Sequence, residues 1–595
     1  MLNIKINGKP LQVEDNISVL EAAKKVNIKI PTLCYNPNLS PWASCGLCIV
    51  RTAGPASPRM ARACTTQVTE NMDIITHDPE ILATRRAVVE LILSNHPDDC
   101  LQCPRNDSCE LQTLSAEFGI REARFKKIPN GLSVDDSNPA IVLNPEKCIR
   151  CGRCVKVCQD VQNVWAIEFQ GRGFKGHIAG AAGTPLGEGP CIKCGQCAAH
   201  CPVGAIYERD DTGKVWAALQ NAEVHPVVQI APAVRVALAE EFGLKPGTII
   251  TKKIYAALRR LGFKTVFDTN FSADLTIMEE GSELVKRLAE QGEIPLITSC
   301  CPAWVDYMEK YYADMIPNFS TAKSPQQMMG AMIKAYWAGK AGVDAGTICS
   351  VSVMPCTAKK WEPHRNDDMK SAARLLGTDT GWDVDIVITT RELARMIKQA
   401  GIEILDLDDE EADSPLGPYT GAGTIFGVTG GVMEAAVRSA YYLVTKKELS
   451  DVNFTPVRGL EGVKEAEVDF GVPVGNHGTK IRIAVAHQMG NIAAVLDKIR
   501  AAREAGAETP YHFVEVMACR GGCIGGGGQP YGCTDEIRKQ RTEGIYADDE
   551  KSRYRCSHQN PCINQVYNEF LGEAGGRKAH DLLHTHYQGR ELYLK

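Results

Sequence analysis

Three widely separated blocks in the C-terminal half of the chain carry cysteines beside small or turn-forming residues. The blocks are Thr298-Ser-Cys-Cys-Pro302, Met354-Pro-Cys-Thr-Ala-Lys359-Lys-Trp-Glu362 and Glu515-Val-Met-Ala-Cys-Arg-Gly-Gly-Cys523. None is a local Cys-x-x-Cys finger, so their thiolates can share one ligand only if a large fold gathers them. Such a gathering favours a buried inorganic cofactor over a simple zinc clip.

The most specific local pattern is an internal repeat of two cysteine runs with the same spacing. The first run is Cys148, Cys151, Cys154 and Cys158, and the second is Cys191, Cys194, Cys197 and Cys201. In bacterial two-cluster ferredoxins the fourth cysteine of each run binds the other cluster. The spacing therefore predicts one [4Fe–4S] cluster on Cys148, Cys151, Cys154 and Cys201, and a second on Cys191, Cys194, Cys197 and Cys158.

Two further candidate sites lie nearer the N-terminus. The first comprises Cys34, Cys45, Cys48 and Cys64, of which only the Cys45-x2-Cys48 core fits the plant-type ferredoxin spacing. Four thiolates suit zinc as well as iron and sulfur, so both metals stay open from spacing alone. In the second, His96 lies four residues before a set that lacks a fourth thiolate: Cys100, Cys103 and Cys109.

Composition limits the classes of protein to which the chain can belong. Its 595 residues exceed what one hydrophobic core serves, so several domains are expected. The net charge of −6 differs from the strongly positive charge that is typical of a nucleic-acid-binding protein. The sequence has no apolar run of the roughly 18 residues that a membrane span needs, and its first residues resemble a strand rather than a signal peptide. We therefore expect a cytoplasmic protein without nucleic-acid or membrane partners, whose 24 cysteines are mainly metal ligands rather than disulfides.

Hydrophobic periodicity predicts the elements that position these ligands. Alternating apolar residues around Asn7-Gly8 predict a hairpin, and Ser18 with Glu21 predicts a capping box at the start of a helix. Beyond about residue 211, helical patterns such as 282–291 and 324–340 alternate with apolar, β-rich runs. These runs lie at 226–231, 265–268, 294–298, 347–353, 385–389, 481–487 and 511–517. The alternation predicts mostly parallel sheets covered by helices. We expect two lobes, roughly 211–355 and 356–530, with the cofactor between them and each cysteine block at the carboxyl end of a strand.

Taken in order, these motifs resemble those of the [FeFe]-hydrogenases, enzymes that interconvert protons, electrons and dihydrogen. The three C-terminal blocks are similar to the active-site signatures of that family. The N-terminal cysteines are similar to the cluster domains of large hydrogenases and respiratory NADH dehydrogenases. The resemblance implies a [2Fe–2S] cluster on the Cys34–Cys64 set and a [4Fe–4S] cluster on the Cys100–Cys109 set with His96 as a ligand. A neutral imidazole in place of a thiolate is expected to raise the potential of that cluster.

The resemblance also implies the H-cluster. This cofactor is a [4Fe–4S] cubane joined through one thiolate to a two-iron unit that carries carbon monoxide, cyanide and a bridging dithiolate with a central amine. Cys523 is the expected bridging ligand in a cubane ligand set of Cys301, Cys356, Cys519 and Cys523. Lys359 is expected to donate a hydrogen bond to cyanide. Pocket roles are expected for Met354, Met517, Gln326 and Phe426, with ordinary core packing as the alternative for both methionines and for Phe426.

A proton route is also carried over from the family. Its first group is the thiol of Cys300, which adjoins a ligand without binding iron, and the outward groups are Glu280, Ser320, Glu283 and Arg287. Arg287 lies one helical turn beyond Glu283 and is expected to hold its charge. Glu279 and Glu293 are expected on a solvated helix face.

The implied architecture is multidomain α/β and α+β. It comprises a β-grasp ferredoxin-like [2Fe–2S] domain (1–80), a [4Fe–4S] domain with one histidine and three cysteine ligands (81–125), a two-[4Fe–4S] ferredoxin domain (126–210), a two-lobed α/β catalytic domain with mixed or parallel sheets (211–545), and a small-subunit-like tail (546–595). Cys349 and Cys533 are expected to be structural. Cys556 and Cys562, with His558 between them, are expected to bind no metal.

The implied function is reversible oxidation of dihydrogen, with electrons passing along the N-terminal clusters. The implied partners are ferredoxin, flavin-bearing NAD(P)-linked subunits of an electron-bifurcating hetero-oligomer, and the maturases that supply the H-cluster. A stand-alone ferredoxin-linked hydrogenase is the alternative arrangement. A non-catalytic hydrogen sensor or cluster-assembly protein of the same fold is the alternative class; such relatives usually lack the Cys300 thiol or a complete ligand set, and this chain keeps both.

Overall fold

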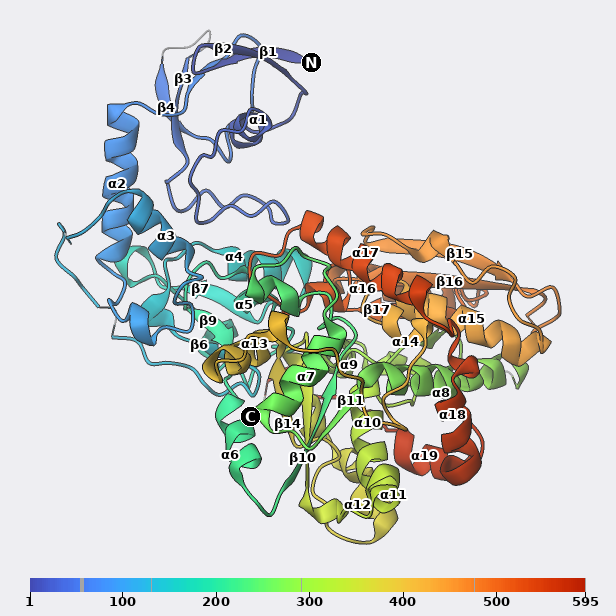
Figure 1. Cartoon of the computed structure of the whole chain (residues 1–595). Coiled ribbons are helices and arrows are strands. Elements are labelled where there is room, and N and C mark those ends of the chain that lie inside the picture. The colour runs from blue at the N-terminus through green and yellow to red at the C-terminus, as the bar shows by residue number, and fades with distance from the viewer. Residues whose placement is uncertain (54–57, 123, 130, 291, 476, 594–595) are drawn as a thin grey trace. The chain divides into compact units, whose positions relative to one another are not determined.

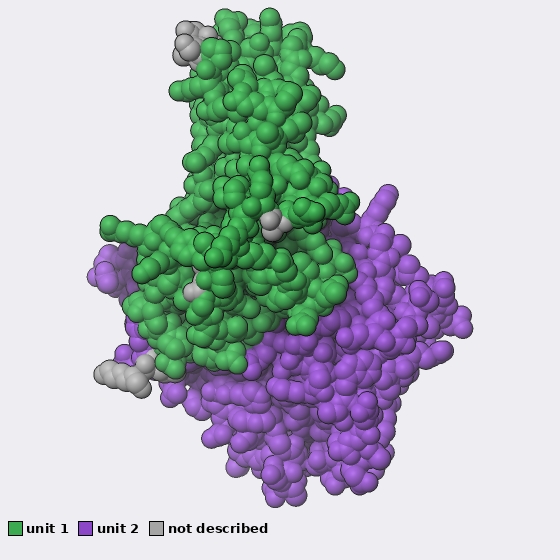
Figure 2. All heavy atoms as spheres, turned by 90° about the vertical axis from the view of Figure 1, so that its left-hand side faces the viewer, with its two compact units in different colours: residues 1–191, 200–207 green, residues 192–199, 208–595 purple. Residues whose placement is uncertain are grey.

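Figure 1 traces the secondary-structure elements of the computed structural model, which describes residues 1–53, 58–122, 124–129, 131–290, 292–475 and 477–593. The chain forms two compact units, coloured green and purple in Figure 2. The first comprises residues 1–191 with 200–207, and the second comprises residues 192–199 with 208–595. Across the described ranges, no helix combines the length and the apolar character that crossing a bilayer requires.

The first unit opens with a five-stranded sheet in the order β2-β1-β5-β3-β4. Its strands are β1 (Leu2–Ile6), β2 (Lys9–Val13), β3 (Ile49–Ala53), β4 (Arg59–Arg62) and β5 (Asp73–Ile75). The predicted hairpin is confirmed, because β1 and β2 pair antiparallel around Asn7 and Gly8, whose φ angles are 51° and 78°. The predicted capping box is also confirmed at the start of α1 (Val19–Lys25). Apolar residues of α1, β1 and β3 share one core.

The two cysteine runs of the internal repeat adopt the same unusual backbone conformation. Arg150 and Lys193, each two residues after the first cysteine of its run, have φ angles of 56° and 62°. Gly152 and Gly195 follow at 79° and 69°. A left-handed backbone is unfavourable for residues with long side chains such as arginine or lysine. Because it recurs at matching positions of both runs, we infer that the loop needs this conformation to present its thiols. Each run contains a short helix, α4 (Arg153–Lys156) in the first and α5 (Gln196–His200) in the second.

Helices and short strands make up the rest of the first unit. They are α2 (Pro79–Leu93), α3 (Glu110–Glu117), β6 (Ile141–Leu143), β7 (Ile167–Gln170) and β8 (His177–Gly180), with β9 (Ile206–Glu208) at its end. Strand β6 pairs with β9, and β7 pairs with β8.

Two four-stranded sheets form the framework of the second unit. The first, in the order β11-β10-β13-β14, is parallel throughout and contains β10 (His225–Ile230), β11 (Thr265–Asp268), β13 (Ile348–Met354) and β14 (Ile386–Thr389). The second, in the order β12-β17-β16-β15, is mixed and contains β12 (Leu296–Ile297), β15 (Val463–Asp469), β16 (Lys480–His487) and β17 (Phe513–Met517). The α/β class with mixed and parallel sheets is thus confirmed. Of the strands described in these two sheets, only β15, an antiparallel edge strand with alternate residues exposed, was not predicted.

The predicted lobe boundary near residue 355 is wrong, because each half of the chain supplies a strand to the sheet of the other half. Strand β14 joins β13 in the first sheet. Strand β12 joins β17 in the second sheet, where Leu296 is opposite Phe513. Apolar runs identify strands but do not show which strand each one pairs with. Parallel strands are joined by long crossover connections, so two strands far apart in the sequence can be neighbours in one sheet.

Helix α8 (Thr269–Ala289) is the long central helix of the second unit (Figure 1). It begins directly after β11, where the side chain of Asp268 accepts a hydrogen bond from the N–H of Asn270. It packs against α10 (Pro325–Met332), α14 (Gly421–Ile425) and α15 (Gly431–Thr445). The sequence predicted only a helix at 282–291. The first half of α8 is buried on all sides, which removes the amphipathic period on which such a prediction depends.

The remaining helices of the second unit cover the sheets and form the C-terminal tail. Those around the sheets are α6 (Thr212–Gln220), α7 (Thr251–Leu261), α9 (Pro302–Tyr311), α11 (Ala338–Ala341), α12 (Ser371–Leu376), α13 (Thr390–Gln399) and α16 (Met489–Glu504). Helix α17 (Asp535–Lys551) leads into the tail, which contains α18 (Pro561–Val566) and α19 (Arg577–Leu583).

Candidate active site

Three strand-to-loop junctions deliver the cysteines of the C-terminal blocks to one place. Cys300 and Cys301 follow β12, Cys356 follows β13, and the loop after β17 carries Cys519 and Cys523. Each junction is at the carboxyl end of its strand, as predicted. Cys301 is also the N-cap of α9.

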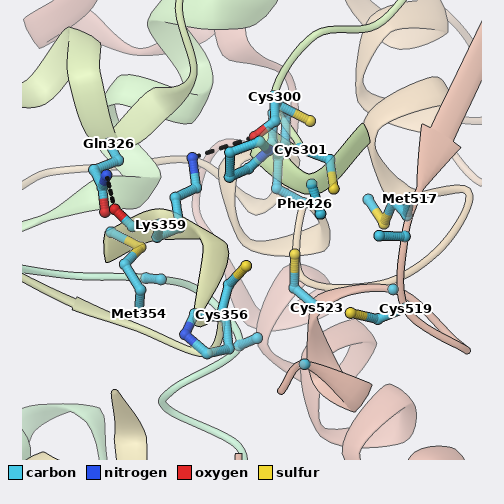
Figure 3. A pocket seen from close by; sticks show the side chains of 18 of the residues that line it. Cys300, Cys301, Gln326, Met354, Cys356, Lys359, Phe426, Met517, Cys519 and Cys523 are labelled. Carbon is cyan, nitrogen blue, oxygen red and sulfur yellow. Dashed lines mark hydrogen bonds between the residues drawn. The ribbon is translucent and has the colours of Figure 1, made fainter. Parts of the chain in front are cut away.

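Four of these thiols face one another around a cavity of about 80 Å³. The side chains of Cys301, Cys356, Cys519 and Cys523 point into a common space (Figure 3). Burial, and then the neighbouring thiols, raises the pKa of Cys356 to about 12 and that of Cys519 well above its ordinary value. Thiols with such raised pKa values hold their protons until a metal binds and releases them.

Every residue predicted to line a cofactor pocket lines this cavity. They are Met354, Met517, Gln326, Phe426 and Lys359. The ammonium group of Lys359 donates to the backbone oxygen of Cys300 at 3.2 Å and to the Glu362 carboxylate at 2.9 Å. Burial alone would lower the pKa of Lys359, but Glu362 outweighs it and the pKa is raised. A permanent cation therefore borders the group of thiols.

The shape and chemistry of this cavity fit an inorganic cluster. Sulfur and apolar groups dominate its lining, and glycines bring the backbone close to it. A side chain at Gly526 would lie 2.2 Å from the carbonyl oxygen of Pro355, and one at Gly522 would lie 2.6 Å from the N–H of Thr429. The amide of Gln196 donates to the sulfur of Cys519 at 3.2 Å and to the carbonyl oxygen of Gly525 at 3.1 Å. Hydrogen bonds of this kind to a ligand sulfur tune iron–sulfur clusters.

Cys300 is directed away from the four facing sulfurs (Figure 3). Burial raises the pKa of its thiol well above the ordinary value, and Glu280 is the next largest cause. Burial, and then the nearby Glu283, raises the pKa of Glu280 to about 8. A buried acid that titrates close to neutral pH can both accept and donate a proton in turnover.

Glu283 connects this buried pair to the protein surface. Its carboxylate accepts from the hydroxyl of Ser320 and from the N–H of Thr321, each at 3.1 Å. Arg287 donates to the same carboxylate at 2.6 Å, and both side chains of this ion pair are 15% exposed. The structure thus joins Ser320, Glu283 and Arg287 by hydrogen bonds. Glu280 lies near Cys300, Ser320 and Glu283, but neither of its carboxylate oxygens makes a hydrogen bond among the described residues.

Glu279 contradicts the expectation of a solvated helix face. It is fully buried and accepts hydrogen bonds from His584 Nε2 at 3.0 Å, from the N–H of Gly575 at 2.8 Å and from the hydroxyl of Tyr567. The prediction was wrong because the residues that bury Glu279 come from the C-terminal tail. The helical periodicity of α8 gives no information about which distant segment packs on the helix. Glu293 is exposed as expected, but it lies in the loop after α8 and not on a helix face.

In the first unit, the cysteines nearest the N-terminus also gather. The sulfurs of Cys48 and Cys64 lie 3.4 Å apart, and Cys34 makes side-chain hydrogen bonds with Cys45 and Cys64. No disulfide forms among them, since all four are free thiols. The arrangement suits a four-thiolate metal site.

His96 presents one ring nitrogen that suits a metal. Its Nδ1 lies 2.9 Å from the carbonyl oxygen of Pro97, which fixes that nitrogen as the protonated one. Its Nε2 is buried without a hydrogen-bond partner among the described residues. Burial lowers the pKa of His96, which keeps the imidazole neutral as a metal ligand must be. Within the associated set, Cys103 lies close to Cys109.

The crossed pattern expected for the cysteine repeat is visible within the first unit. Cys201, the last cysteine of the second run, is beside Cys148 and Cys151 of the first run. Cys158, the last of the first run, is beside Cys191 of the second. These proximities agree with the predicted exchange of the fourth ligand.

Several residues of the site were not identified from the sequence. Gln196 lies inside a cysteine run, where only the cysteines carried a signal. Glu362 lies three residues after Lys359, a separation at which a salt bridge could have been expected. Tyr587 and His584 contact the proton route from the tail, and their distance along the chain hid them. Among the remaining cysteines, Cys556 lies within 4.8 Å of ligand atoms of Glu448 and His558, whereas Cys562 packs against an apolar cluster.

Comparisons with known proteins agree with this geometry. Residues 224–527 match the family described as iron only hydrogenase large subunit, C-terminal domain, and residues 535–590 match iron hydrogenase small subunit. The N-terminal matches are a 2Fe-2S iron-sulfur cluster binding domain (1–79), the NADH-ubiquinone oxidoreductase-G iron-sulfur binding region (85–124) and a 4Fe-4S dicluster domain (147–205).

Full-length relatives and a solved structure are similar as well. The chain is 45% identical to the NADP-reducing hydrogenase subunit HndD of Solidesulfovibrio fructosivorans, over 99% of both chains. It is 38% identical to iron hydrogenase 1 of Clostridium pasteurianum, over 99% of this chain and 100% of that one. A variant of the apo [FeFe]-hydrogenase HydA1 from Chlamydomonas reinhardtii superposes with a TM-score of 0.56 at 41% identity, over 64% of this chain and 100% of the other.

Proposed function

Because the chain belongs to the iron-only hydrogenase family, we propose that it catalyses the reversible oxidation of dihydrogen to protons and electrons. The observation that carries the proposal is the pairing of two features in one place. Four cysteines from three loops face one cavity, and Cys300 stands beside them at the head of a file of titratable groups. A proton route beside the gathered thiols is what an enzyme that turns over dihydrogen needs, and it favours this function over that of a sensor or an assembly protein of the same fold.

The ligand assignments follow from the gathered thiols. Cys301, Cys356, Cys519 and Cys523 would hold the H-cluster, with Cys523 as the bridging ligand. When bound, that cofactor supplies the iron at which dihydrogen is split or formed. The cation of Lys359 borders the same cavity and can donate a hydrogen bond to an anionic ligand there. Gln326 fixes this lysine loop by donating to the carbonyl oxygen of Lys359 at 3.3 Å.

Protons would move along the chain's own side chains. The Cys300 thiol remains protonated because burial raises its pKa, so it can donate a proton toward the cavity and be recharged from Glu280. Glu280 in turn exchanges with Glu283 across the hydroxyl of Ser320, which donates to Glu283. Arg287 stabilises the anionic form of Glu283 and so keeps this outer group ready to exchange with water.

Electrons would pass through iron–sulfur clusters on the remaining cysteines. We propose one [2Fe–2S] cluster on Cys34, Cys45, Cys48 and Cys64, and three [4Fe–4S] clusters, one of them with His96 as a ligand. The crossed neighbours Cys201 and Cys158 support the two-cluster ferredoxin arrangement. Single-electron carriers in series suit a two-electron reaction whose acceptor is remote from the iron.

The partners are proposed from the full-length similarity to a subunit of an NADP-reducing hydrogenase. A flavin-bearing NAD(P)-linked subunit, with or without ferredoxin, would receive the electrons, since the sequence carries no nucleotide fingerprint of its own. Maturases would supply the H-cluster, in a cytoplasmic setting. A stand-alone ferredoxin-linked enzyme is the alternative arrangement.

Replacing Cys300 by serine tests the proposed proton route. The wild-type protein, matured and purified without oxygen, should consume dihydrogen with a dye as acceptor and show infrared bands of iron-bound carbon monoxide and cyanide. Cys300→Ser should keep the bands and iron content but lose about 100-fold or more in turnover, because a hydroxyl is a far weaker acid than a thiol. Dihydrogen uptake by Cys300→Ser at the wild-type rate would refute the route. A matured wild-type protein without any uptake would refute the function itself.

A further inference from the structure

Residues 583–587 of the C-terminal tail run beside the segment that carries Ser320. The N–H of Thr585 donates to the carbonyl oxygen of Thr321 at 2.8 Å, and the N–H of Lys323 donates to the carbonyl oxygen of Leu583 at 2.8 Å. Between these bonds, Ala322 and His584 form an antiparallel bridge. The backbone just after Ser320 is therefore paired with residues at the far end of the chain.

Tyr587 adds a side-chain contact to Ser320 itself. Its hydroxyl donates to the backbone oxygen of Ser320 at 3.0 Å. Its ring meets the ring of Phe319 edge-on, with centroids 5.0 Å apart, and the guanidinium of Arg365 lies 4.8 Å from its centroid. Burial raises the pKa of Tyr587, so the phenol remains a donor. Tyr587 thus holds both the ring of Phe319 and the backbone of Ser320.

His584 ties the same segment to helix α8. Its Nδ1 lies 2.8 Å from the hydroxyl oxygen of Thr321, and its Nε2 lies 3.0 Å from the Glu279 carboxylate. Glu279 precedes Glu280 on α8. One imidazole therefore links the Ser320 segment to the helix that carries both glutamates of the proposed proton route.

We propose that His584 and Tyr587 are positioning residues for proton transfer, and that the tail segment 583–587 clamps Ser320 between Glu280 and Glu283. This inference rests on the proposed function. Proton transfer needs heavy atoms within about 2.6–3.2 Å, and the hydroxyl of Ser320 is 3.1 Å from Glu283. That separation is near the upper limit, and neither carboxylate oxygen of Glu280 has a hydrogen-bond partner among the described residues. The position of the Ser320 backbone therefore decides whether its hydroxyl can bridge from Glu283 to Glu280, while the metal ligands stay in place.

The test uses matured holoenzyme and two conservative tail variants. Tyr587→Phe keeps the ring and its contacts but removes the donor to Ser320. His584→Gln replaces the imidazole with an amide, which can still donate a hydrogen bond but cannot reproduce the link between Thr321 and Glu279. The matched control is Tyr336→Phe, because the Tyr336 hydroxyl donates to Glu569 of the tail at 2.8 Å, away from the proton route. Readouts are iron content, infrared bands, the rate at saturating dihydrogen, KM, and the rate ratio between H₂O and D₂O.

Loss of one hydrogen bond predicts a fall of about 3- to 10-fold in rate at saturating dihydrogen for Tyr587→Phe. The infrared bands and KM should match those of the wild type, and the H₂O/D₂O rate ratio should rise because proton transfer limits turnover more. Tyr336→Phe should resemble the wild type in every readout.

Two results would overturn the inference. One is wild-type rate and isotope ratio in both tail variants. The other is a slower rate with an unchanged isotope ratio, or with loss of infrared bands, since either marks a general structural role. The proposed function fails separately, through absence of dihydrogen uptake by both the wild type and Tyr336→Phe.

Discussion

At the scale of single residues, the site depends on groups whose protonation is shifted by burial. Glu280 is the leading example, because it is fully buried on α8 and its pKa is raised to about 8. Between the ordinary pKa of 4.5 and this value, the folded protein holds a proton that the unfolded chain releases. The contribution of Glu280 to stability is therefore complete below pH 4.5 and is lost as the pH rises toward 8.

Glu280→Gln should remove this pH dependence, because an amide cannot ionise. We expect the thermal midpoint of the variant to rise relative to the wild type as the pH goes from about 5 to 8, by the equivalent of about 1 kcal/mol per pH unit. Thermal unfolding monitored by circular dichroism at several pH values measures it. Glu293→Gln, at an exposed position, is the control. Parallel curves for both variants would mean that Glu280 is not held protonated.

His96 makes a residue-scale prediction about the first unit. His96→Cys should retain its iron but lower the midpoint potential of one cluster by on the order of 100 mV, because a thiolate adds negative charge. Redox titration followed by electron paramagnetic resonance measures the shift. His77→Cys, at an exposed position, is the control. If His96→Cys leaves every potential unchanged, His96 is not a ligand.

At the scale of elements, the close crossing of α14 and α8 positions one wall of the cavity. Gly423 of α14 approaches Asn270 of α8 so closely that a side chain on Gly423 would lie 2.4 Å from the Asn270 backbone oxygen. Phe426, which lines the cavity, follows directly after α14. The glycine thus sets the depth at which this aromatic ring sits.

Gly423→Ala should destabilise the second unit by about 1–2 kcal/mol, the cost of overpacking less the gain in helix propensity. It should also slow dihydrogen uptake by moving Phe426. Gly339→Ala in α11 is the matched control, since a side chain there meets nothing within 4 Å among the described residues. Thermal unfolding of both variants measures the difference in stability. Equal midpoints would show that helices α8 and α14 can move apart to accommodate the added methyl group, and would contradict the prediction.

Local elements were predictable from sequence to the extent that local residues determine them. The hairpin at Asn7-Gly8 and the capping box at Ser18 follow from neighbours in the chain. The pairing of β12 with β17 and the burial of Glu279 do not, because the residues that decide them are far away in sequence. The same limit applies to the site: spacing identified the cysteines, whereas Gln196 and Tyr587 were recognised only through contacts.

At the scale of the whole molecule, the partner proteins determine which acceptor receives the electrons. Native enzyme purified without oxygen should take up dihydrogen faster when ferredoxin and NAD(P)⁺ are supplied together than with either alone, if flavin-bearing subunits accompany it. Following ferredoxin and NAD(P)H spectroscopically in the same cuvette measures this. Full activity of the isolated chain with ferredoxin alone would assign it to the stand-alone class instead.

The pairing of β12 with β17 has a consequence for how the chain is made. The N–H of Val516 in β17 donates a hydrogen bond to the hydroxyl of Thr298, which lies just after β12 and 218 positions earlier in the chain. At about 5–20 residues per second, a ribosome needs about 10–45 s to cover that interval. Throughout it, the nascent chain carries Cys300 and Cys301 beside a strand that still lacks its neighbour. A cofactor held by Cys301 together with Cys519 and Cys523, as proposed, would therefore be inserted only after β17 has been synthesised, and conditions that slow elongation should lengthen the period in which the Cys300 and Cys301 thiols are open to oxidation.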